Sequence, residues 1–178
     1  MTSARCGGRT WMRGMAIGAV LAGVLTAGAE AQERPAPALD LSAGWIGFAD
    51  DGIVSELAAG GAFRWHLTPR ISVGPEITFI EGENHSHQVL TGNLIVDLRA
   101  PAPDGTPRVT PFVVIGGGVF RTSQSFSGRS FSSTEGAFTV GGGIRAPLSD
   151  RVELGVDARL GWEPHLRVAG VLGIRLGR

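Results

Sequence analysis

The stretch VELGVDARLGW, at residues 152–162, divides into two chemically different sets when it is read at alternate positions. One set is apolar throughout and ends in Trp162, whereas the other carries Glu153, Asp157 and Arg159. Successive side chains of a β-strand point to opposite sides, so the pattern predicts a strand with one apolar face and one charged face. Such a strand can cover a water-soluble core, or it can face lipid on its apolar side.

The same division recurs along the chain, without helical periodicity of useful length between the runs. Turn signals rich in Pro, Gly, Ser and Asp separate eight such runs, and strands of this length suit a bilayer crossing when they are tilted. The segment at 109–123 is apolar on both faces through its middle, so its orientation stays open. The predicted strands cover residues 39–48, 56–67, 71–81, 89–99, 109–123, 135–148, 152–162 and 165–176.

The connections between these strands alternate in character. Turns at 68–70, 100–107 and 149–151 join strands on one side. The other side carries a loop around Asp50, the polar loop GENHSHQ (82–88), a Ser-rich loop at 123–133 and a short WEP connection. The sequence therefore predicts an all-β fold, an eight-stranded antiparallel up-and-down transmembrane β-barrel.

The charged residues of the strands fall on one face. The chain contains no Lys, and Arg is the better partner for a buried carboxylate because its guanidinium pairs bidentately. We expect a self-neutralising charge network in the lumen. Its predicted members are Asp40, Glu56, Arg64, Glu76, Asp97, Arg99, Glu135, Arg145, Glu153, Asp157, Arg159, Arg167 and Arg175.

The opposite face is apolar almost without interruption. An eight-stranded barrel encloses room for little more than its own side chains, so these apolar groups would overfill the interior if they pointed inward. Facing lipid they need no interior volume, and Trp45, Trp65 and Trp162 are predicted to mark the lipid interface. The alternative is a soluble periplasmic barrel that binds a small apolar ligand, with its apolar face turned inward.

The N-terminal segment predicts export. Three Arg residues precede an uncharged apolar run at 15–29, and Ala29-Glu30-Ala31 has the small-x-small pattern of a cleavage site. We expect a signal peptide at 1–31, a short lead-in at 32–38 and the barrel domain at 39–178. The one cysteine, Cys6, falls within the predicted signal peptide, so the barrel has no disulfide or thiol site.

Two motifs carry possible chemistry. The Gly triplets at 116–118 and 141–143 lack the Lys and the following helix of a phosphate loop, so they are interpreted as tight packing within strands. His85 and His87 alternate with Ser86 and could hold a metal with a nearby carboxylate, but short His pairs in polar loops are common. The sequence thus predicts no catalytic, cofactor or metal residue, and its zero net charge favours no nucleic-acid partner.

The segments TPFVVIGGGVFR, GGGIRAPLSDRVELGVDARLGW and VAGVLGIRL resemble the last four strands of small bacterial outer-membrane β-barrel proteins of the OmpA-like and OmpX-like type. The resemblance implies location in the outer membrane, insertion by the outer-membrane assembly machinery, periplasmic termini and outward loops. It also implies contact with outer-membrane lipid and lipopolysaccharide. A monomer with a structural or surface-interaction role is expected.

Outer-membrane lipid A deacylases are also eight-stranded barrels, and they use a His, a Ser and an acid at the outer rim. Their motif places Ser two residues after His, with Asn following. In this chain Ser86 is adjacent to His85 and Asn84 precedes both, so the motif does not match. A lipid-modifying hydrolase is therefore the weaker alternative to a non-enzymatic protein.

Overall fold

The computed structural model describes residues 35–50, 52–82, 85–99, 108–126, 129–162 and 164–177. The chain separates into two units, Met1–Glu33 and Arg34–Arg178, and all described residues belong to the second. The expected signal peptide and the first part of the lead-in lie outside the described residues. Within the described ranges, no helix is long and apolar enough to cross a membrane.

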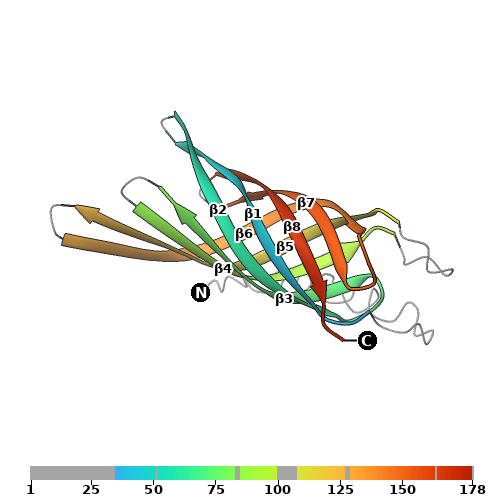
Figure 1. The fold of residues 1–178 in the computed structure, drawn as a ribbon. Helices are drawn as coiled ribbons and strands as arrows, with labels where there is room; N and C mark the ends of the chain where they lie inside the picture. Colours follow the sequence, from blue (N-terminus) through green and yellow to red (C-terminus); the bar gives the residue numbers. More distant parts are fainter. Residues whose placement is uncertain are drawn as a thin grey trace, which may run out of the picture. The chain divides into compact units, whose positions relative to one another are not determined.

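Eight strands form one closed antiparallel barrel in which each strand pairs with its sequence neighbours and β8 pairs with β1 (Figure 1). Closure gives every strand two hydrogen-bonded neighbours and leaves no open sheet edge where all eight strands pair, as a lipid environment requires. The predicted eight-stranded barrel is confirmed. The strands are β1 (Ala38–Asp50), β2 (Gly52–His66), β3 (Ile71–Glu81), β4 (His85–Asp97), β5 (Thr110–Phe126), β6 (Arg129–Pro147), β7 (Val152–Gly161) and β8 (His165–Arg175).

The two faces of β7 show which side is buried. Asp157 is 1% exposed, whereas its neighbour Val156 is 51% exposed. The same alternation holds on the other strands, where large apolar side chains such as Leu57 lie outside and polar ones inside. A soluble barrel with its apolar face turned inward is therefore wrong for this chain.

The orientation of β5, which the sequence left open, is settled by burial. Val114 and Phe120 are each 2% exposed and point inward, whereas Val113, Ile115 and Val119 are exposed. Both faces of β5 are apolar because its inward side chains belong partly to an apolar layer inside the barrel. Alternation of hydrophobicity could not distinguish the two faces there.

Three predicted loops are largely strand. Around Asp50, β1 extends to Asp50 and β2 begins at Gly52. Residues 85–88 belong to β4, and most of the Ser-rich segment at 123–133 belongs to the β5–β6 hairpin, whose pairing continues to Phe126↔Arg129. Hydrogen bonding along a ladder needs no apolar side chain, so strands that extend past the membrane carry polar residues on both faces. Periodicity of hydrophobicity, which was the sequence signal, disappears at that point.

The strands differ in length at the end of the barrel opposite Ala38 and Arg175. β6 has 19 residues and β7 only 10, and their pairing stops at Thr139↔Gly161. Residues 129–138 of β6 therefore pair with β5 and have no partner on β7. Figure 1 shows the β3–β4 and β5–β6 hairpins extending from this end of the barrel.

Candidate functional site

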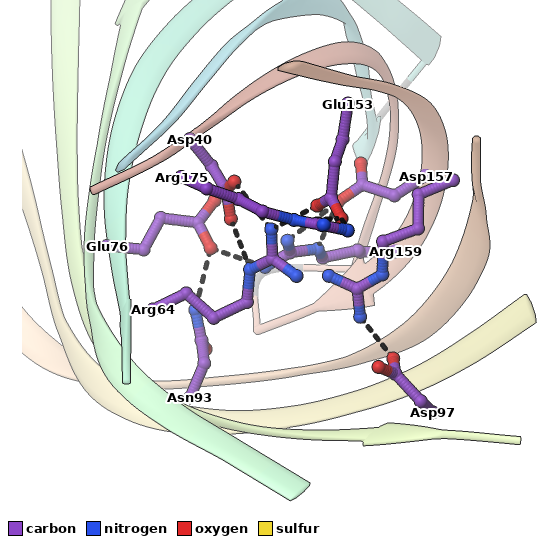
Figure 2. Close-up of polar contacts among 10 residues, drawn as sticks. Asp40, Arg64, Glu76, Asn93, Asp97, Glu153, Asp157, Arg159 and Arg175 are labelled. Carbon is purple, nitrogen blue, oxygen red and sulfur yellow. Dashed lines mark hydrogen bonds and ion pairs between the residues drawn. The ribbon is translucent and has the colours of Figure 1, made fainter. Parts of the chain in front are cut away.

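Inward positions of seven strands bring most of the predicted charged residues together in the lumen (Figure 2). At one level Arg64 of β2 donates to both carboxylate oxygens of Asp40 on β1, with Nε–Oδ2 and Nη2–Oδ1 distances of 3.0 Å. Arg64 Nη2 also donates to Glu153 Oε2 of β7 at 2.8 Å. Arg175 of β8 donates to the other oxygen of Glu153 through Nε at 3.1 Å and Nη2 at 2.5 Å. Two acids and two bases thus form a neutral cluster.

A second neutral cluster lies around Glu76 of β3. Its Oε2 accepts from Arg159 Nη1 of β7 at 2.5 Å and from Asn93 Nδ2 of β4 at 2.6 Å, and its Oε1 accepts from Arg167 Nη1 of β8 at 2.7 Å. Asp157 accepts from Arg159 Nη2 at 2.6 Å and from Arg167 Nη2 at 3.4 Å. All five side chains are buried. The cluster spans the lumen and joins β3 to strands that are distant in the sequence.

A separate ion pair joins Asp97 of β4 to Arg145 of β6. The Arg145 guanidinium also lies 4.6 Å from the centroid of the Phe112 ring. Three predicted members do not join any of these groups, namely Glu56, Arg99 and Glu135. Arg99 lies beyond the end of β4, is exposed and donates to the Val109 carbonyl at 3.5 Å. Glu135 has the predicted inward register but is exposed, because β7 does not reach that height of β6.

Above the charged clusters lies an apolar layer that the sequence analysis did not identify. Ile46, Ala58, Ile80 and Phe120 form its buried core, and other partly buried apolar side chains pack against them. The signal was present in the sequence, since Ile46 and Ile80 interrupt the polar face of their strands. A single apolar residue on a polar face does not by itself predict an apolar layer. The layer becomes visible only in the closed barrel, which places four such residues at one level.

The interior leaves little free space in the part of the chain that the structure describes. One cavity of about 50 Å³ lies among the charged clusters, and one of about 30 Å³ lies between them and the apolar layer. Glu76 and Arg159 line both cavities and so separate them. Phe120 lines the second.

At the mouth opposite Ala38 and Arg175, Glu56 of β2 and two histidines of β4 point inward together. His85 Nε2 lies 2.5 Å from Glu56 Oε1, and His87 Nδ1 lies 3.0 Å from Thr122 Oγ1 of β5. One potential ligand atom from each of Glu56, His85 and His87 lies within 4.8 Å of the others. Glu56 was predicted to join the lumen network, but the structure pairs it with His85 at the mouth.

Ser86 lies between the two histidines in sequence and points to the opposite face. It is exposed, whereas His87 is 9% exposed. Alternation along β4 therefore keeps the hydroxyl away from the neighbouring imidazole rings. A nucleophile needs a base within hydrogen-bond reach, so this strand geometry disfavours a Ser–His catalytic pair between these neighbours.

Both Gly triplets lie within strands, as their interpretation required. A Cβ atom on Gly116 would collide with the Asn93 side chain, and one on Gly141 would collide with the Ala158 carbonyl. Neighbouring strands and lumen side chains therefore approach the backbone closely at these positions. No phosphate-binding turn exists at either triplet.

The three tryptophans predicted to mark the lipid interface lie on the outer face. Trp65 is near the end of β2 and 60% exposed, and Trp162 directly follows β7, with its ring 5.9 Å from that of Phe138. Trp45 lies within β1, and its ring extends over Gly47, where a Cβ atom would meet it at 2.5 Å. These positions suit aromatic side chains at a lipid interface.

Comparison with known proteins identifies the family. A family model described as an outer membrane protein β-barrel domain matches residues 17–167, which is most of the chain. The chain belongs to this family. No curated protein sequence matches it. Membership in this outer-membrane barrel family agrees with the apolar outer face and supports location in the outer membrane.

Solved outer-membrane barrels have the same fold. Neisserial surface protein A (NspA) matches with a TM-score of 0.69 at 10% identity, covering 82% of this chain and 100% of that one. The N-terminal barrel domain of OprF from Pseudomonas aeruginosa matches with a TM-score of 0.59 at 12% identity, covering 81% and 100%. Ail, the attachment invasion locus protein of Yersinia pestis, matches with a TM-score of 0.53 at 11% identity, covering 78% and 95%. At these identities the likeness concerns the fold alone.

Proposed function

We propose that the protein is a non-enzymatic, monomeric outer-membrane barrel with a structural or surface-interaction role. In this proposal the segment 1–31 is a cleaved export signal and the assembly machinery of the outer membrane inserts the barrel. The outward hairpins contact lipopolysaccharide or a surface partner, while Arg–carboxylate pairs seal the lumen. The observation that carries the proposal is an ion-paired, neutral interior within a barrel whose outer surface is apolar.

The filled lumen supports a sealed barrel. Each of the two large clusters contains two acids and two bases, so neither presents a net charge that would attract ions. The cavities of about 50 and about 30 Å³ are far smaller than an aqueous channel, and eight strands leave no room for one. Solute transport is therefore not the function that this interior favours.

The hairpins support a surface role. β5 and β6 continue as a ladder well past the height at which β7 ends, so the chain builds ordered structure beyond the closed barrel. Neighbours in fold include proteins named for the cell surface and for attachment, and Ail was crystallised with the heparin analogue sucrose octasulfate. An ordered polar projection above a sealed barrel suits adhesion better than catalysis or transport.

Cell fractionation and surface labelling test this proposal. We expect the protein in the outer-membrane fraction. Its measured mass should be that of a chain whose first residue is Gln32, and its gel mobility should change on boiling. An antibody against the tip of the β5–β6 hairpin should bind intact cells. Recovery in the soluble fraction, or antibody binding only after the cells are opened, would contradict it.

Lipid analysis separates the proposal from the hydrolase alternative. Lipid A from cells that produce the protein should carry the same acyl chains as lipid A from cells that lack it. The Ser86→Ala variant should give the same result as the unaltered chain. A loss of acyl chains that requires Ser86 would establish an enzyme instead.

A further inference from the structure

Glu56, His85 and His87 share an unusual position at the outer mouth of the barrel. Leu57 pairs with Glu81 and Glu81 pairs with Ser86, so Glu56, Gly82 and His85 occupy one row across β2, β3 and β4. A Cβ atom on Gly82 would lie 2.5 Å from Glu56 Oε1 and 2.6 Å from His85 Nε2. The missing side chain on the middle strand lets the outer two residues meet.

His87 lies one inward position deeper on the same strand. Its ring centroid is 4.9 Å from that of His85, and it packs against the rings of Phe48 at 5.5 Å and Phe120 at 5.1 Å. Thr122 contacts its Nδ1 atom, which holds the ring in orientation. A hydrogen-bonding partner behind a histidine and an apolar floor beneath it are common features around metal-binding imidazoles.

The carboxylate of Glu56 is incompletely satisfied. Its side chain is 3% exposed, and His85 accounts for Oε1, but Oε2 has no hydrogen-bond partner among the residues that the structure describes. A buried carboxylate oxygen without a partner costs free energy unless another group binds it. An ion pair between Glu56 and His85 alone would leave Glu56 Oε2 without a partner. It would also not explain why His87 points toward the same place.

We propose that Glu56, His85 and His87 form a binding site for a divalent transition-metal ion, Zn²⁺, at the outer mouth of the barrel. Two imidazole nitrogens and one carboxylate oxygen are a donor set that Zn²⁺ accepts, with a fourth position left for water or an external ligand. Magnesium and calcium prefer oxygen ligands and would not be retained by two histidines. The site would lie directly above the apolar layer, because Phe120 belongs to that layer and contacts His87.

The local geometry needs only a small adjustment to accept the ion. Ligand atoms of a tetrahedral zinc site with bonds of roughly 2.0–2.2 Å lie roughly 3.3 Å apart, which is wider than the 2.5 Å between His85 and Glu56. The His85 side chain is 30% exposed and lies near the start of β4, so it can move outward. Glu56 and His87 are more deeply buried, so we expect the larger movement at His85.

Metal binding to the purified, tag-free protein folded in detergent tests the proposal. After dialysis against Zn²⁺ and removal of free metal, elemental analysis should give one zinc ion per chain, and Mg²⁺ or Ca²⁺ should not compete. His85→Ala and His87→Ala should each weaken the affinity measured by calorimetry at least tenfold. Thr122→Val, which removes the partner behind His87, should weaken it about 10- to 100-fold.

The matched control is His165→Ala, which removes another histidine at the same rim, whose ring packs against Phe48 and whose Nδ1 atom contacts the Trp162 carbonyl. This variant should bind zinc as the unaltered chain does. Heat-dependent gel mobility verifies that each variant is folded, and His85→Gln provides a second, milder change. If the unaltered protein takes up no zinc, or if the His85→Ala/His87→Ala double variant binds it equally well, the proposal is overturned and the cluster is an ion pair only.

Discussion

At the scale of single residues, an arginine in the lumen contributes to stability through the carboxylates it pairs with rather than through its charge alone. Arg64 is 3% exposed and provides the contacts that neutralise both Asp40 and Glu153. Removal of one partner from a buried ion pair leaves an uncompensated charge, and this typically costs about 3–5 kcal/mol. Arg99 is also an arginine of the predicted network, but it is exposed, and surface charges contribute about 0–1 kcal/mol.

We therefore expect Arg64→Met to lower the free energy of unfolding by about 3–5 kcal/mol, since the buried carboxylate of Glu153 and the partly buried carboxylate of Asp40 lose their common partner. The matched change Arg99→Met should alter it by about 0.5 kcal/mol or less. Urea unfolding in phospholipid vesicles, followed by tryptophan fluorescence, measures both. Equal losses for the two variants would mean that the arginines of the lumen are not specifically paired.

Glycine positions give a second prediction at this scale. A Cβ atom on Gly74 would collide with the carbonyl oxygen of Phe63 on the neighbouring strand, whereas one on Gly136 would meet nothing within 4 Å. Gly74→Ala should reduce stability by more than about 1 kcal/mol, because the β2 and β3 backbones must separate. Gly136→Ala should leave stability unchanged or raise it slightly. The same unfolding assay decides, and similar effects of the two changes would argue against the close approach at Gly74.

At the scale of the elements, the sequence determined the strands wherever one face had to be apolar. For β7 the predicted residues 152–162 differ from the observed strand by one residue, and its charged face points inward. The predicted strand boundaries were incomplete where neither face has to be apolar, as in the parts of β4 and β6 that extend beyond the membrane. It was also incomplete inside the lumen, because the apolar layer and the Glu56–His85 contact depend on which residues the closed barrel brings to one level.

The outer face of β7 offers a direct test of the surrounding solvent. Val156 lies in the middle of the strand and is 51% exposed, so an arginine there would be placed in the bilayer core. Val156→Arg should cost about 2–4 kcal/mol in vesicles, whereas Leu148→Arg in the turn before β7 should cost about 0–1 kcal/mol. Unfolding in vesicles measures the difference. Equal and small costs would mean that both positions face water.

At the scale of the whole molecule, two different layers of side chains lie in series along the lumen, and in the proposed function both block it. The ion-paired clusters fill the part near the short turns and the middle, and the apolar layer closes the space above them. A charged network that loosens can admit water, but ions would still meet an apolar constriction. An apolar layer that opens would still lead to a neutral, hydrogen-bonded plug, so loss of one layer should not produce a channel.

Arg159 and Phe120 are the side chains to remove, because Arg159 separates the two lumen cavities and Phe120 lines the outer one. In planar bilayers the unaltered protein, Arg159→Ala and Phe120→Ala should each show no stable channel. The Arg159→Ala/Phe120→Ala double variant should conduct, because it joins the cavities and opens the apolar layer above them. The control Arg121→Ala/Phe79→Ala removes the same residue types from exposed positions that line neither cavity and should stay closed. Heat-dependent gel mobility ensures that only folded protein is compared. Conduction by either single variant at the level of the double variant would show that one layer alone seals the barrel.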